Sequence, residues 1–121
     1  MKNQKIYIEG AQAGALFLKD IEIIIAETFL TRLAGLMLKK PLPPATGLLL
    51  APCNSVHMCF MRFAIDVIYL DRDYNIIKVV KNLKPWIGIS MCSYAYAALE
   101  MTAGEAERCG CEVGQKLMLI R

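Results

Sequence analysis

Several features are missing from this 121-residue sequence, and each absence excludes a class of protein. The chain has one histidine, so a metal site built from several imidazole ligands is excluded. No apolar run approaches the ~18 residues that a membrane-spanning helix needs, and no glycine-rich phosphate loop or nucleophile elbow is found. The first residues lead into an alternating strand pattern without the apolar core of a signal peptide. We therefore expect a cytoplasmic protein with no membrane span.

The charge balance and the cysteine content exclude two more classes. Fourteen basic and eleven acidic residues give a net charge of only +3, and the lysines are scattered rather than gathered in a stripe. We therefore expect no nucleic-acid partner. Five is an odd number of cysteines, and without a secretory signal they favour free thiols over a disulfide framework.

Apolar side chains make up 56% of the chain and occur in short runs separated by turn residues. A chain of this length has room for one core, so we predict a single domain over residues 1–121. The runs predict about seven short strands, and capping residues predict two short helices. The strands are expected at 5–9, 20–26, 48–50, within 56–71, and at 76–80, 94–101 and 116–120, and the helices after Thr28 and over 105–109. The predicted fold is α+β, a mostly antiparallel, barrel-like sheet.

The central stretch, residues 56–71, carries polar side chains inside an apolar run, Arg62 and Asp66 among them. A buried charge costs several kcal/mol unless it is paired, so these groups should be paired, hydrated or used. On a straight strand they would lie about 13 Å apart, so they meet only if the chain bends; Asp66 could instead reach Arg32. One interpretation is a polar or anionic ligand clamped by Arg62 and oriented by Asp66. The other is a purely structural ion pair.

Three further side chains complete the predicted binding site. His57 lies in the central stretch, Glu100 ends an apolar strand, and Trp86 follows a proline in a loop, where a large ring commonly lines a ligand mouth. We predict that His57 and Glu100 make secondary polar contacts and that Trp86 forms an apolar wall. All three would converge with Arg62 and Asp66 at one end of the barrel.

A metal site is the weaker alternative for the same stretch. Strand alternation puts His57, Cys59 and Met61 on one face, and these ligand types suit a soft ion such as Cu(I) or Zn(II). No CxxC spacing supports this alternative, and the CxC of Cys109 and Cys111 is expected to serve packing. We expect no cofactor.

Several motifs occur in a fixed order along the chain. They are Arg32–Met37, Gly47–Leu50, Val56–Asp71, Pro85-Trp86, Leu99-Glu100, and the glycines 104, 110 and 114. Together they resemble the prokaryotic family called domain of unknown function 192, over about residues 28–120. The resemblance implies a small, barrel-like α+β domain and no catalytic assignment. The sequence departs from the family at Ala64, where proline is frequent, and at Gln115, where an acid is usual.

These observations favour binding over catalysis. The predicted function is a non-catalytic module for an unidentified small polar or anionic ligand. The alternative is a protein-interaction or dimerisation module, in which apolar surface meets a protein partner or a second copy and the Arg–Asp network is structural. A thiol- and histidine-based metal protein or enzyme is the third class.

Overall fold

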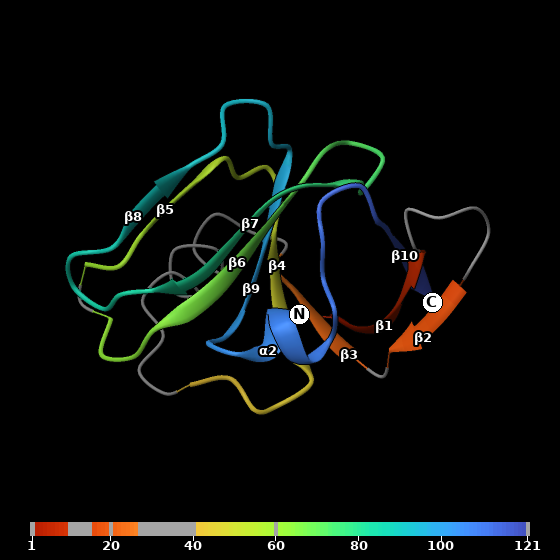
Figure 1. Ribbon diagram of the computed structural model, residues 1–121, viewed down its shortest axis with the longest axis horizontal. Coiled ribbons are helices and arrows are strands. Elements are labelled where there is room, and N and C mark those ends of the chain that lie inside the picture. Colours follow the sequence, from red (N-terminus) through yellow and green to blue (C-terminus); the bar gives the residue numbers. More distant parts are fainter. Residues whose placement is uncertain (1, 10–15, 20, 27–40, 60, 121) are drawn as a thin grey trace.

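The computed structural model describes residues 2–9, 16–19, 21–26, 41–59 and 61–120, with the side chains of 41–59 and 61–118 (Figure 1). These residues form ten strands and one short helix. The strands are β1 (Lys2–Glu9), β2 (Leu16–Lys19), β3 (Ile21–Ala26), β4 (Thr46–Leu50), β5 (Ser55–His57), β6 (Ile65–Leu70), β7 (Ile76–Leu83), β8 (Ile89–Met91), β9 (Ala97–Thr102) and β10 (Lys116–Ile120), and the helix is α2 (Glu105–Arg108). That helix is too short to cross a membrane.

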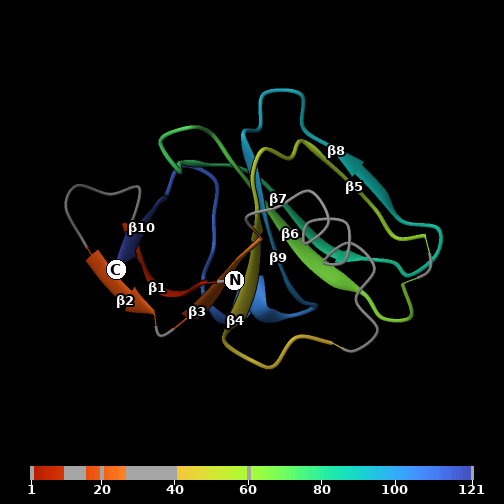
Figure 2. The same cartoon turned by 180° about the vertical axis from the view of Figure 1, so that it is seen from behind.

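Eight strands form one sheet in the order β10-β1-β3-β4-β9-β6-β7, with β2 paired to β1, and β5 and β8 form a separate pair. Only β3 and β4 run parallel, so the predicted mostly antiparallel sheet is confirmed. Figures 1 and 2 show the β5–β8 pair at one end of the molecule and β1, β2 and β10 at the other.

The prediction of a barrel is wrong for the described strands. β10 and β7 stand at opposite ends of the sheet order and are not paired with each other within the described residues. The chain at the start of β7 is joined to the start of β10 by one isolated bridge, between Asn75 and Lys116, and by three backbone hydrogen bonds that link residues 74–76 with residues 114–117. These contacts do not extend into a ladder between the two strands, so the described strands do not close into a barrel. The described residues contain one helix rather than two, and the helix predicted after Thr28 lies outside them.

The middle of the sheet is buried on both faces, as its continuous apolar runs predict. All residues of β6 are buried, and so are those of β9 except Thr102. One face of β6 and β9 packs against α2, and we call it the α2 face; the opposite face packs against β5, and we call it the β5 face. The α2 face carries Ile68, Leu70, Leu99 and Met101 with Ala106 of the helix, and the β5 face carries Val67, Tyr69 and Ala98 with Val56 of β5.

Candidate functional site

Glu100 is the most unusual polar side chain among the described residues. It lies in the middle of β9, paired with Leu48 of β4 on one side and with Val67 of β6 on the other, and it is 1% exposed. Neither carboxyl oxygen has a hydrogen-bond partner within the described part of the chain. Burial away from water disfavours the charged form and raises the pKa of Glu100 to about 8.

Two hydroxyl groups accompany Glu100. Tyr69 pairs with Ala98 while Val67 pairs with Glu100, so Tyr69 and Glu100 are diagonal neighbours on the β5 face. The Tyr69 hydroxyl is buried, as is the hydroxyl of Ser90 from β8, and neither meets the geometry of a hydrogen bond. We call Glu100, Tyr69 and Ser90 the polar cluster.

The electrostatics of Tyr69 agree with this proximity. Burial raises the pKa of the phenol, the nearby Ser90 hydroxyl opposes the rise, and charge on Cys53, Cys92 or Glu100 adds to it. Cys53 and Cys92 also pack against the core of the β5 face, so two thiols lie in the surroundings of the polar cluster.

The polar cluster holds four buried oxygen atoms without a partner in the described residues. Leaving a buried polar group unsatisfied costs about 1–3 kcal/mol, and native structures contain few such groups. An ionised carboxylate only accepts hydrogen bonds, whereas a hydroxyl both donates and accepts. Chemically, the cluster is suited to receive a group rich in N–H or O–H donors.

Asp66, in contrast, is fully engaged with the backbone. Its Oδ1 accepts a hydrogen bond from the Asn82 amide at 2.8 Å, and its Oδ2 accepts from the amides of Gly104 and Ala106 at 2.9 Å each. Because Asp66 pairs with Met101, it lies on the α2 face, opposite Glu100. Its carboxylate joins β6 to the end of β7 and to the start of α2.

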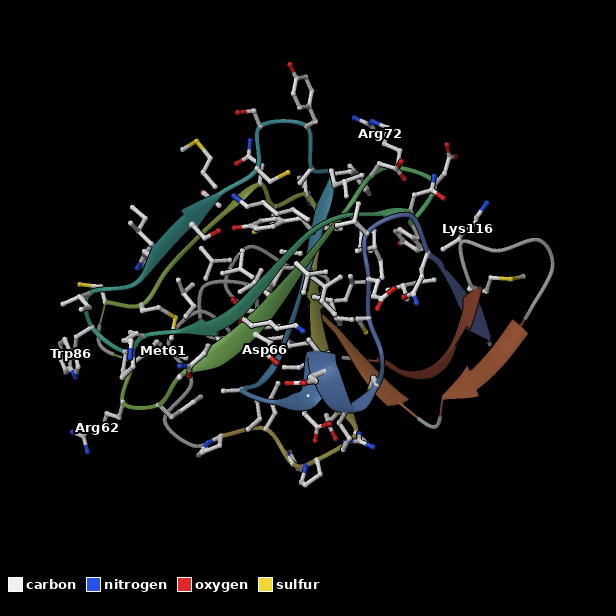
Figure 3. The ribbon with its side chains drawn as sticks, in the orientation of Figure 1. Met61, Arg62, Asp66, Arg72, Trp86 and Lys116 are labelled. Carbon is white, nitrogen blue, oxygen red and sulfur yellow. The ribbon has the colours of Figure 1, made fainter. Side chains whose placement is uncertain are left out.

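The structure does not bring Arg62 and Asp66 together. Arg62 is exposed, its side chain points away from Asp66 in Figure 3, and no ion pair joins the two, both of which are described. Trp86 is 53% exposed and lies near Arg62 at the same end of the molecule. Arg32 lies outside the described residues. The five side chains predicted to converge are thus divided between the two faces of the sheet and the surface.

The residues of the weaker metal alternative are also placed. His57 and Cys59 are exposed, whereas Met61 is buried in the core of the β5 face. Within the ranges that the structure describes, no three His, Cys, Asp or Glu side chains are grouped so that they could hold a metal ion. The arrangement gives this alternative no support.

The sequence indicated Glu100 but not Tyr69 and Ser90, its two neighbours in the polar cluster. A signal for Tyr69 was available, since a phenol inside a mostly apolar strand needs a partner for its hydroxyl. No signal in the sequence marked Ser90, because β8 reaches the β5 face only through tertiary folding.

A second feature is a row of exposed apolar side chains around β8. We call it the apolar ridge; its members, with their exposed fractions, are Trp86 (53%), Ile87 (81%), Ile89 (76%), Met91 (62%) and Tyr94 (91%). A shallow pocket of about 370 Å³ lies beside it, lined by residues 55–57 and 89–91. Clustered apolar side chains of this size are typical of interaction surfaces.

Comparison with known proteins places these features in a family context. Residues 11–119 match the DUF192 family, described as "Uncharacterized ACR". A UPF0127 protein of Pyrococcus furiosus is 36% identical over 104 residues, covering 80% of this chain and 85% of that protein. A UPF0127 protein of Pyrococcus horikoshii is 40% identical over 68 residues, covering 54% of this chain and 58% of that protein.

Two solved structures share the fold. One, from Sinorhizobium meliloti 1021 and provisionally named a transcription regulator, has a TM-score of 0.83 at 20% identity, covering 98% of this chain and 94% of that chain. The other, a protein of unknown function from Novosphingobium aromaticivorans, has a TM-score of 0.73 at 21% identity, covering 93% and 82%. At these identities the likeness establishes the fold alone.

Proposed function

We propose a function from the site itself, because the chain belongs to the DUF192 family, which is described only as uncharacterised. The proposed function is binding of a small polar ligand at the polar cluster, without catalysis. The observation that carries it is the group of four buried side-chain oxygens without a partner in the described residues. Such groups lower stability, and residues kept at the expense of stability are typical of binding sites.

The polar cluster favours a hydrogen-bond donor over an anion as the ligand. A carboxyl group repels an anion once it is ionised, and the nearby thiols offer no positive charge. An anionic ligand would instead need a cation such as Arg62, whose side chain is exposed at the surface and points away from Asp66 (Figure 3). Roles for Arg62, Asp66, His57, Trp86 and Arg32 in ligand binding stay predictions.

The test is the stability of the ligand-free protein after each oxygen is removed. Glu100→Met replaces the carboxyl by an apolar chain of similar length, and Tyr69→Phe removes only the hydroxyl. We expect both variants to unfold at higher urea concentration than the parent at pH 7.5, since each removes an unsatisfied buried group. Met101→Leu, on the same strand but the α2 face, is the control for repacking and should be neutral or slightly destabilising. Lower stability of both test variants would overturn the proposal.

A second candidate function is self-association through the apolar ridge. The observation that favours it is the exposure of five large apolar side chains within nine residues, 86–94. We would measure sedimentation velocity over a hundredfold range of concentration for the parent and for Ile89→Asp. Val113→Asp is the matched control, because Val113 is also exposed, at 60%, but lies outside the ridge. A dimer lost only in Ile89→Asp supports this function, and a monomeric parent at all concentrations refutes it.

A further inference from the structure

We propose that the group bound at the polar cluster is a primary ammonium, whose three N–H bonds point to Glu100, Tyr69 and Ser90. The inference rests on the proposed function and deepens it, because it names the chemistry of the ligand. The ammonium could belong to a small free amine or to the lysine side chain of another protein, and the experiment below separates these sources.

The number and arrangement of acceptor oxygens in the polar cluster favour an ammonium. Tyr69 and Glu100 are diagonal neighbours on adjacent strands, and Ser90 approaches the Tyr69 hydroxyl from β8. Three side chains from three strands thus offer acceptor oxygens, and all these oxygens lack a partner in the described part of the chain. An ammonium has three donors and no acceptor, so one such group can satisfy one oxygen on each side chain.

The acidic side chain of Glu100 favours a ligand with a positive charge. An ionised carboxylate at the buried position of Glu100 needs either hydrogen-bond donors, which the described residues do not supply, or a positive charge beside it. Lys78 lies on the other side of Tyr69: its Nζ is 6.0 Å from the centre of the Tyr69 ring and donates to the Met91 carbonyl at 2.8 Å. Because Lys78 is exposed, its ammonium stays at the surface, and the positive charge beside Glu100 belongs to the ligand.

The residues around Glu100 favour an organic cation over a metal ion. A metal ion would need several charged or imidazole ligands, and the described residues contain no such group of three. The neighbours of Glu100 across the sheet are apolar, Leu48 on one side and Val67 on the other. Apolar neighbours suit the carbon chain that carries an organic ammonium.

Binding of an ammonium has a defined proton balance. Because the pKa of Glu100 is raised to about 8, its carboxyl group is mostly protonated at pH 7 in the free protein. When the ammonium binds, the carboxyl proton leaves to solvent and a carboxylate–ammonium pair forms; no covalent bond to the ligand is made. Among the described residues, the other titratable groups near this site are the phenol of Tyr69, the thiols of Cys53 and Cys92, and the ammonium of Lys78.

The experiment is isothermal titration calorimetry with n-butylammonium chloride at pH 7.0, in phosphate and in MOPS, neither of which contains a primary amine. The two buffers differ in ionisation enthalpy, so the difference in measured heat gives the number of protons released. n-Butanol is the neutral probe of the same shape. Glu100→Gln keeps the size of the side chain but cannot ionise, and Glu107→Gln, an exposed acid on α2, is the matched control.

We expect the parent to bind n-butylammonium with release of close to one proton, and to bind n-butanol more weakly. Glu100→Gln should bind n-butylammonium about tenfold or more weakly, whereas Glu107→Gln should match the parent. A lysine peptide, acetyl-Gly-Lys-Gly-amide, that binds more tightly than n-butylammonium would identify a protein lysine as the source; the reverse order would identify a free amine. Equal binding of n-butanol, or binding without proton release, would overturn the assignment.

Failure of this inference is distinguishable from failure of the proposed function. If n-butylammonium does not bind while Glu100→Met is more stable than the parent, the ammonium assignment is wrong and the polar site remains. If Glu100→Met and Tyr69→Phe are both less stable than the parent, both are wrong.

Discussion

Replacing Asp66 by asparagine tests how the carboxylate holds the α2 face together. The Asp66 carboxylate accepts hydrogen bonds from three backbone amides, those of Asn82, Gly104 and Ala106, at donor–acceptor distances of 2.8–2.9 Å. An asparagine has one carbonyl oxygen, which can keep the two amides at α2, and its NH₂ group then faces the Asn82 N–H. One charge-assisted bond is lost, worth about 1.5–3 kcal/mol, and a buried donor is left unpaired, at about 1–3 kcal/mol.

We therefore expect Asp66→Asn to lower the free energy of unfolding by about 3 kcal/mol or more. Urea unfolding followed by tryptophan fluorescence and by circular dichroism measures this change. Arg62→Met is the matched comparison, because Arg62 is exposed and should change stability by less than about 0.5 kcal/mol. Equal losses in the two variants would mean that the residues act as a pair, and the structural account of Asp66 would be refuted.

Three further predictions concern pH, packing and thiol reactivity. Burial raises the pKa of Glu100 from 4.5 to about 8, so between these pH values the native state holds a proton that the unfolded state has lost. The free energy of unfolding of the parent should therefore fall by up to about 5 kcal/mol, relative to that of Glu100→Gln, as pH rises from about 4.5 to above 8. A parallel pH dependence in the two proteins would contradict this. Gly88→Ala should lose about 2 kcal/mol in urea unfolding, since the new Cβ would lie 2.9 Å from Met58 Cγ and closer still to backbone; unchanged stability would refute the packing. The exposed Cys59 should react with Ellman's reagent in the native protein while the buried Cys109 does not, and Cys59→Ser should remove the fast phase.

Elements with a local cause could be predicted from the sequence. The apolar runs predict strands within 56–71 and at 76–80, and the structure pairs Val67–Leu70 with Ile76–Val80 as an antiparallel hairpin. The short helix was placed at 105–109 by its flanking glycines, and α2 spans Glu105–Arg108, with Gly110 at a φ of 67° just beyond it. The last strand was predicted with the bounds that β10 has.

Elements with a tertiary cause were missed. β5 and β8 have three residues each and pair only with one another, so no alternation is long enough to reveal them. The central stretch has the composition of one apolar strand, but the strand ends after β5. The chain turns there, because the Met58 carbonyl accepts hydrogen bonds from the backbone amides of Met61 and Trp86. Arg62 consequently lies outside any strand, and the spacing argument that linked it to Asp66 does not apply.

The candidate site divides in the same way. A carboxylate at the end of a predicted apolar strand marked Glu100. The structure places it inside β9 instead, where β4 and β6 flank it and bury it. Tyr69 and Ser90 could not be identified as neighbours of Glu100. Their proximity depends on which face of the sheet each strand turns toward the core and on where β8 packs, and a single sequence specifies neither.

The central claim is that Glu100 is buried in the free protein without a partner among the described residues, and its protonation can be observed directly. Carbon-13 NMR of protein labelled at the glutamate side-chain carboxyl carbons, with Glu100→Gln to assign the signal, gives its titration midpoint. A midpoint near pH 8 is the predicted result. A midpoint near 4.5, the ordinary value for glutamate, would mean that water or a partner already satisfies the carboxylate, and the proposed binding site would lose its basis.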